Sequence, residues 1–411
     1  MKEKFISALN YFNLFWVLVL TASSIYCFEF QRIPFFMFFI SYFIEFIVER
    51  KWENFRFDRK KFYYCVLGLF FLLAFFYHSF STPEKYFGSL ITRRLAIFGF
   101  AFIGIFGLNK RYKLSYLLNT FIISSIFAIF YLVFYRIGIV EFLSNPNRSE
   151  LFSNERIIYV NNHMEFNLFL NTSLVCIWYL LTKSWTRIHW LKKIFYIVAI
   201  LIFSYILIIS EGRSGFQTGI ILFTIFIFME IWKRNKRLGI IVGLAAPFLL
   251  FATVRHQQRM SDNNIKTEPR IYLWKAALSE IKEKPIFGYG IDQAQEHFDT
   301  ARVKYETKEF AEFWNSKVKI LHCHNQYLQT TMEFGIFGLL ILLFLYAYPI
   351  FATDGNRKLL SFFFIIPCAY QSLFDVFITG VNYATIFCVL MLCILSIENN
   401  IAQNEKPKVN R

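Results

Sequence analysis

Long apolar stretches make up most of this chain, and short polar segments separate them. The hydrocarbon core of a bilayer accommodates a helix of about 20 apolar residues, so each stretch is a candidate membrane-spanning helix. Twelve stretches are predicted, near residues 5–28, 34–48, 62–80, 95–109, 114–135, 164–182, 194–210, 214–232, 238–254, 327–350, 359–376 and 378–397. We therefore expect an all-α polytopic membrane protein.

One long polar stretch interrupts this pattern and divides the chain into three parts. Residues 1–254 hold predicted helices one to nine, residues 255–326 form a loop, and residues 327–411 hold helices ten to twelve and a tail. The loop ends in His322-Cys323-His324-Asn325, just before the chain becomes apolar again. A polar segment that carries a histidine to the mouth of a membrane helix is the first candidate for chemistry.

The composition agrees with a membrane protein, because 56% hydrophobic residues and 54 Phe lie far outside the soluble norm. The net charge of +16 does not indicate nucleic-acid binding, since 24 of the 44 Lys and Arg residues fall in alternate connections and at both termini. This is the positive-inside pattern of an even number of spans. Both termini are therefore predicted to be cytoplasmic, with the long loop on the opposite side and membrane lipids as partners.

The cysteines and histidines predict neither a disulfide framework nor a metal site. Six of the seven cysteines lie in or beside apolar stretches, so Cys323 is the only thiol in the loop. His322-Cys323-His324 has ligand types that zinc uses, but no second cluster stands at zinc-like spacing. No phosphate-binding glycine loop is present either. We expect no cofactor and no metal, so any phosphate must be bound by arginines.

Three arginines stand on the outer side, against the topological bias. Arg213 lies in the tight turn Ser210-Glu211-Gly212-Arg213-Ser214-Gly215, Arg94 opens the fourth span, and Arg270 lies within the loop. An ionisable residue at the membrane face is a functional hypothesis by default. The structural alternatives are snorkelling or pairing with Glu211 for Arg213, and headgroup anchoring for Arg94.

A helix is predicted over residues 269–284. Thr267 is a suitable N-cap and Pro269 fits the first turn. Arg270 would then stand near the N-terminal end, where backbone N–H groups favour anions. The apolar stripe that would lie on the outer membrane surface consists of Ile271, Trp274, Leu278 and Ile281.

These motifs together resemble the O-antigen ligase and polymerase superfamily. The similarity rests on Arg270-Ile271-Tyr272-Leu273-Trp274, on Pro285-Ile286-Phe287-Gly288-Tyr289-Gly290, on Gly212-Arg213-Ser214-Gly215, and on the spacing of His324-Asn325 from Gly335 and Gly338. That spacing is similar to the signature of the ligase branch. Twelve spans with a long outer loop between the ninth and tenth also fit the family.

The resemblance implies a GT-C type glycosyltransferase in the bacterial inner membrane with its site facing the periplasm. Its donor would be a glycan on undecaprenyl diphosphate, and its acceptor the lipid A-core oligosaccharide. Arg213 and Arg270, with Arg94 as a third member, would bind the diphosphate because guanidinium groups bind phosphate bidentately. His324 would be the general base, whereas His322 and the two glycines are assigned structural roles.

The acceptor is left open by the sequence. An O-antigen polymerase or a protein O-oligosaccharyltransferase of the same superfamily would share the donor, the topology and the arginines. A lipid-linked glycan flippase is a more distant alternative, which would place its charges in a central cavity and need no histidine at the outer face.

Overall fold

The computed structural model describes residues 2–26, 28–53, 55–78, 87–108, 112–146, 151–152, 157, 163–186, 188–210, 213–245, 269–305, 322–378 and 381–396. Within these ranges the regular elements are helical and no strand occurs. The helices are α1 (Lys2–Ser23), α2 (Phe28–Val48), α3 (Arg59–His78), α4 (Phe87–Phe106), α5 (Leu114–Phe130), the π-helix η1 (Tyr131–Ile137), α6 (Ile139–Ser144), α7 (His163–Ser184), α8 (Trp190–Ile209), α9 (Arg213–Arg234), α12 (Pro269–Glu283), α13 (Ile291–Arg302), α15 (Gln326–Phe351), α16 (Gly355–Gln371) and α17 (Val381–Ser396).

The polytopic membrane character is confirmed. In the described ranges, seven helices are long and apolar enough to cross a membrane, and the shorter helices Arg94–Phe106 and Tyr383–Ser396 are also apolar. Eleven of the predicted stretches coincide with a described helix. The stretch 238–254 is helical over residues 238–245, and its remainder lies outside the described residues. The count of twelve crossings therefore stays a prediction.

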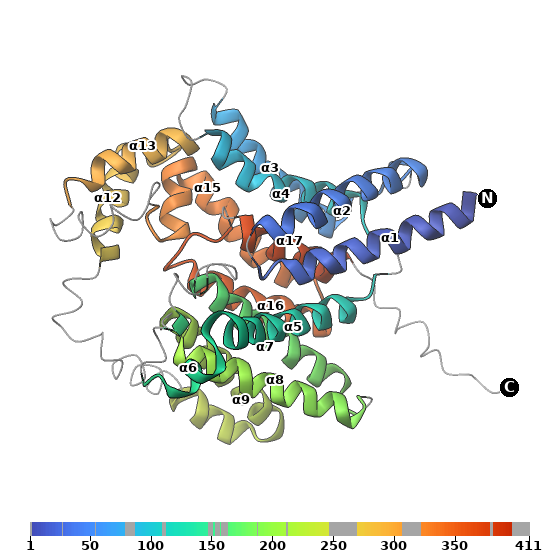
Figure 1. Ribbon diagram of the computed structural model, residues 1–411. Coiled ribbons are helices and arrows are strands. Elements are labelled where there is room, and N and C mark those ends of the chain that lie inside the picture. The colour runs from blue at the N-terminus through green and yellow to red at the C-terminus, as the bar shows by residue number, and fades with distance from the viewer. Residues whose placement is uncertain are drawn as a thin grey trace.

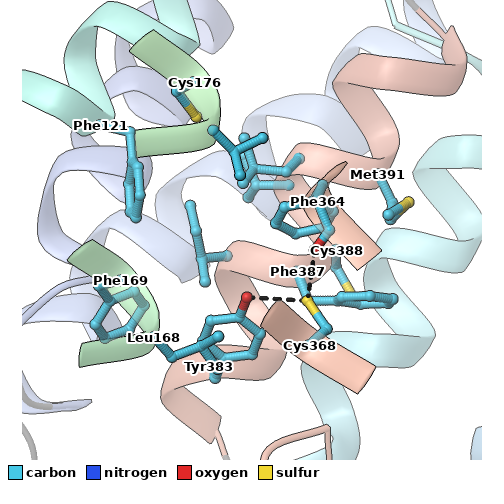
Figure 2. Packing of buried hydrophobic residues seen from close by; sticks show 14 of the residues in the cluster. Phe121, Leu168, Phe169, Cys176, Phe364, Cys368, Tyr383, Phe387, Cys388 and Met391 are labelled. Atoms are coloured by element: carbon cyan, nitrogen blue, oxygen red, sulfur yellow. Dashed lines mark hydrogen bonds between the residues drawn. The ribbon is translucent and has the colours of Figure 1, made fainter. Parts of the chain in front are cut away.

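The core of the bundle forms around α17, which is buried on all sides. Phe387 on α17 stacks on Phe364 of α16, and Tyr383 packs against Phe169 of α7 (Figure 2). The Tyr383 hydroxyl lies 3.1 Å from Cys368 Sγ, so its polar group has a partner in this apolar surrounding. A helix with no lipid-facing side has to be apolar all round, which explains why α17 shows no polar stripe.

Helices α12 and α13 lie at the end of the bundle opposite the N-terminus, beside α15 (Figure 1). This is the arrangement that the charge pattern predicts for a loop on the far side of the membrane from the N-terminus. Which face is periplasmic stays a prediction, because no membrane is present in the structure.

The helix predicted at residues 269–284 is present as α12, whereas the placement of its apolar stripe on the membrane surface stays a prediction. Leu278 is 46% exposed, whereas Leu273, Ala276 and Ala277 are buried against α13, α15 and Cys323. The small alanines let α13 approach closely, so packing against neighbouring helices selects the face of α12 that is buried within the protein. The N-cap assigned to Thr267 lies outside the described residues.

Helix α13 was not predicted. Ile291, Ala294, Phe298 and Ala301 lie at helical spacing, and all are buried. That spacing is the signal that would have identified the helix, although the short segment has too few large apolar residues to stand out.

Candidate functional site

His324 lies beside a carboxylate from a distant part of the chain. Its Nδ1 is 3.2 Å from Oδ1 of Asp375, in the segment between α16 and α17. His322 approaches the same oxygen with its Nε2 at 3.5 Å. Asp375 is 5% exposed, so two imidazoles and one buried carboxylate meet at the N-terminal end of α15. This pairing can orient an imidazole for proton transfer.

Local hydrogen bonds fix the backbone around His324. Asn325 is the N-cap of α15, and its side chain accepts a bond from the Leu328 N–H and donates one to the Leu373 carbonyl. The Gln326 N–H donates to the Ser372 carbonyl at 2.8 Å. His324 itself has φ of 50°, the left-handed region that non-glycine residues seldom adopt. The start of α15 is therefore tied directly to the segment that carries Asp375.

The electrostatics favour an ionised Asp375. Burial raises the pKa of the Asp375 carboxyl, but the hydrogen bond from His324 and the charges of the two imidazoles outweigh burial, so the pKa lies well below its ordinary value. Cys323 differs: burial raises the pKa of its thiol, which donates to the Asn325 carbonyl at 3.2 Å. An undissociated buried thiol is a poor nucleophile, so the chemistry of this cluster falls to the imidazoles.

No second ligand cluster stands at zinc-like spacing in the sequence, but the folded chain brings Asp375 next to the two histidines. One ligand atom from each of His322, His324 and Asp375 lies within 4.8 Å of the others. This contact could not be read from the sequence spacing, because Asp375 is far from the histidines along the chain and falls inside the predicted stretch 359–376. A carboxylate within an apolar stretch is itself a signal of function, and it would have identified Asp375.

Arg94 is buried and ion-paired within the bundle. It is 2% exposed, and its Nη2 lies 2.8 and 2.7 Å from the two carboxylate oxygens of Glu333 on α15. Gln329 donates to the same carboxylate at 3.0 Å. Nε and Nη1 of Arg94 have no hydrogen-bond partner among the described residues. Glu333 was not predicted, although it too is a carboxylate inside an apolar stretch.

Arg94 does not join the His324 cluster. Glu333 lies nine residues beyond His324, which corresponds to roughly 13 Å along a helix at 1.5 Å per residue. The Arg94–Glu333 ion pair therefore lies farther from the N-terminal end of α15 than the two histidines do.

Helix α15 is broken where the loop segment 285–290 meets it. Gly335 has φ of 63°, and a Cβ there would clash with the Ile286 carbonyl oxygen. The N–H groups of Tyr289 and Gly290 donate to the Met332 and Glu333 carbonyls, and the Ile336 N–H donates to the Pro285 carbonyl. The motif Pro285–Gly290 therefore docks on α15 through its backbone.

The role assigned to the two glycines of α15 is close packing. Gly335 packs directly against the backbone of Ile286, whereas a Cβ at Gly338 would meet the side chain of Phe334, one turn earlier.

Arg270 and Arg213 are both carried to the start of α7. Arg270, the second residue of α12, donates to Met164 Sδ at 3.5 Å, in the first turn of α7. Arg213 is the first residue of α9, and its side chain lies outside the described set. One turn further along α7, Asn167 packs against Gly215. The N-terminal ends of α7, α9 and α12 therefore gather at one place.

A hydrogen bond between side chains connects the N-terminal end of α9 to the chain segment near the histidine cluster. Gln217 on α9 accepts a hydrogen bond from the Tyr370 hydroxyl at 2.7 Å, at the end of α16. Tyr370 stands five residues before Asp375. The start of α9 and the segment holding Asp375 are thus positioned against each other.

Comparison with known proteins gives consistent results. Residues 197–343, from α8 into α15, match a family model described as O-antigen ligase. A provisionally named polysaccharide ligase of Rickettsia typhi is 28% identical over 259 residues, 61% of this chain and 59% of the relative. Another, from Rickettsia conorii, is 32% identical over 152 residues, 34% of each chain. The chain thus spans between a third and three fifths of the length of these relatives. Arg213, Arg270 and His324 lie within the family match, whereas Arg94 and Asp375 lie outside it.

Proposed function

We propose, on the match of residues 197–343 to the O-antigen ligase family model, that the chain is a GT-C type inner-membrane glycosyltransferase with its site on the periplasmic side. It moves a glycan from undecaprenyl diphosphate to the lipid A-core oligosaccharide. The observation that carries the proposal is the contact between His324 and the buried Asp375, at the mouth of a membrane helix. A flippase has no need of an oriented base there, so this contact favours a transferase.

In the proposed reaction, His324 acts as general base. Nδ1 faces Asp375, so the proton of the acceptor hydroxyl goes to Nε2. The acceptor oxygen forms a bond to the anomeric carbon while the bond from that carbon to the diphosphate breaks, with inversion. Asp375 is the positioning residue, because its negative charge orients the imidazole and stabilises the imidazolium that forms. Such a base contributes about 10²–10⁴-fold to a rate.

Arg213 and Arg270 are the proposed diphosphate clamp. Both belong to helices that start beside the first two turns of α7, and a guanidinium keeps its charge in any environment. They stabilise the charge that develops on the leaving diphosphate, so the step needs no metal ion and no cofactor.

Arg94 is the third proposed donor-binding residue. Two of its guanidinium nitrogens lack a partner within the described part of the chain, which gives it capacity for a phosphate oxygen. Glu333 neutralises its charge, so Arg94 would act through hydrogen bonds more than through net charge.

Deleting the gene and analysing lipopolysaccharide and carrier-linked glycan tests the reaction class. The proposal expects loss of all polymer on lipid A-core while polymer accumulates on undecaprenyl diphosphate. Capping with single repeats would indicate a polymerase, loss of protein glycans an oligosaccharyltransferase, and absence of outward-facing carrier glycan a flippase; each of these would refute the ligase assignment.

Purified variants test the roles of individual residues. His324→Ala should lower the transfer rate about 100-fold or more, and a wild-type rate would remove the general base. Arg213→Lys keeps the charge but loses the planar fork, so the donor KM should rise. An unchanged KM would refute bidentate binding. Turnover that a chelator abolishes and a divalent ion restores would refute the metal-free step.

A further inference from the structure

Two histidines and a carboxylate form a compact set of metal-ligand atoms at the start of α15. Asp375 Oδ1 lies 3.2 Å from His324 Nδ1 and 3.5 Å from His322 Nε2. In a tetrahedral zinc site with bonds of about 2.0–2.1 Å, neighbouring ligand atoms stand about 3.3–3.5 Å apart, so the two distances to Asp375 fit such a site. The ligand atoms of the two histidines lie within 4.8 Å of each other, and the rings would close to the same spacing on binding. We propose that His322, His324 and Asp375 bind Zn²⁺, and that the bound ion inhibits glycosyl transfer. The inhibition rests on the proposed function, whereas the binding does not.

The chemistry of the ligands selects the class of ion. Two imidazole nitrogens with one carboxylate oxygen suit Zn²⁺, whereas Mg²⁺ and Ca²⁺ prefer sites built from oxygen alone. Cys323 is not a fourth ligand, because its thiol is fully buried and donates to the Asn325 carbonyl at 3.2 Å. Three protein ligands leave one coordination position for water or a substrate oxygen.

Binding requires a change in one hydrogen bond. His322 Nδ1 accepts from the His324 N–H at 3.2 Å. An imidazole that gives its Nε2 lone pair to an ion carries its proton on Nδ1, so this bond is lost. One neutral hydrogen bond is exchanged for a metal–nitrogen bond, which lowers the affinity for Zn²⁺ without removing the site.

The ion and the transfer reaction need opposite protonation of His324. As general base, His324 holds its proton on Nδ1, toward Asp375, and offers the lone pair of Nε2. Zn²⁺ takes the lone pair of Nδ1, so the neutral ring keeps its proton on Nε2. The acceptor hydroxyl then has no base to receive its proton. Asp375 is coordinated at the same time and no longer orients the ring.

Binding is tested by titrating the full-length protein in nanodiscs with Zn²⁺ against a chromophoric zinc chelator. We expect one competing site per chain. His322→Ala and Asp375→Asn should each weaken it at least about 100-fold, since even outer-shell partners contribute 10–100-fold. His297→Ala is the matched control, because His297 Nδ1 lies 3.3 Å from Glu280 Oε2 and forms a pair without a second histidine. Equal affinity in all variants would overturn the site.

Inhibition is tested by assaying transfer across the same titration. Zn²⁺ should lower the wild-type rate and a chelator should restore it, whereas His322→Ala, measured against its own metal-free rate, should require at least about 100-fold more Zn²⁺ for the same fractional inhibition. Bound Zn²⁺ that leaves the rate unchanged or raises it would overturn the inhibition. A protein that binds Zn²⁺ through the triad but transfers no glycan would refute the proposed function and support the site.

Discussion

Removal of one partner of the buried pair Arg94–Glu333 should be among the most destabilising single substitutions in the bundle. The side chains are 3% and 2% exposed, with a shortest N–O distance of 2.7 Å. Removing one partner leaves the other charge buried, which typically costs about 3–5 kcal/mol. Arg94→Met should lie in this range, because among the described residues only Gln329 would still donate a hydrogen bond to the Glu333 carboxylate. Glu333→Gln should cost less, because the amide oxygen still accepts one bond from Arg94.

Equilibrium unfolding in mixed detergent and dodecyl sulfate micelles measures these free energies. The double variant Arg94→Met/Glu333→Leu should lose far less stability than the sum of the single variants, because it leaves neither charge uncompensated. The exposed pair Lys233–Glu230 has the same 2.7 Å distance, with side chains 53% and 43% exposed. Lys233→Met should therefore cost under about 0.5 kcal/mol.

Two results would refute this reasoning. A loss of less than about 1 kcal/mol in the free energy of unfolding for Arg94→Met would show that other groups solvate the charge of Glu333, since a buried charge without a partner destabilises a fold by more than this. Additive single variants would show that the two side chains are not energetically coupled. If the double variant folds, its donor KM tests separately whether Arg94 also binds the diphosphate.

Three further outcomes are expected. Gly335→Ala should destabilise the fold by at least about 2 kcal/mol in the same unfolding assay, because φ is positive and the new Cβ meets the Ile286 carbonyl. The control Gly68→Ala should be neutral or stabilising, because its new Cβ meets only Ala101 Cβ at 3.5 Å. Equal destabilisation by the two substitutions would contradict the steric argument. Asp375→Asn should lower kcat about 100-fold with little change in the acceptor KM, so a pure KM effect would exclude a positioning role. Arg270→Gln should raise the donor KM about 10-fold or more, since a hydrogen bond to a charged group contributes about 1.5–3 kcal/mol; an unchanged KM would remove it from the clamp.

Hydropathy predicted the helices well because a membrane span needs an uninterrupted apolar stretch, and that requirement is local. Pro269 predicted the start of α12 for the same reason. The buried face of α12 could not be predicted, because it depends on α13 and α15, which meet it only in the folded chain. Leu273 and Ala276 look no different in sequence from residues that would face lipid.

The candidate site was predicted in part. His324 and the three arginines were selected by their place relative to the spans, and their roles stay predictions. Asp375 and Glu333 were missed because the hydropathy of their neighbours hid them within apolar stretches. Their partners lie at large sequence separations, so only the folded chain reveals the pairs.

The docking of segment 285–290 limits how this protein can be altered in length. The Pro285 carbonyl accepts from Ile336, and the Gly290 N–H donates to Glu333, so both ends of the segment are held at two points of α15 a fixed distance apart. One inserted or deleted residue between them would break this register and rotate α13 relative to α12. Tags, epitopes or grafted sequences should therefore be kept out of this six-residue interval, where even a conservative insertion is expected to disrupt the packing of α12 and α13 on α15.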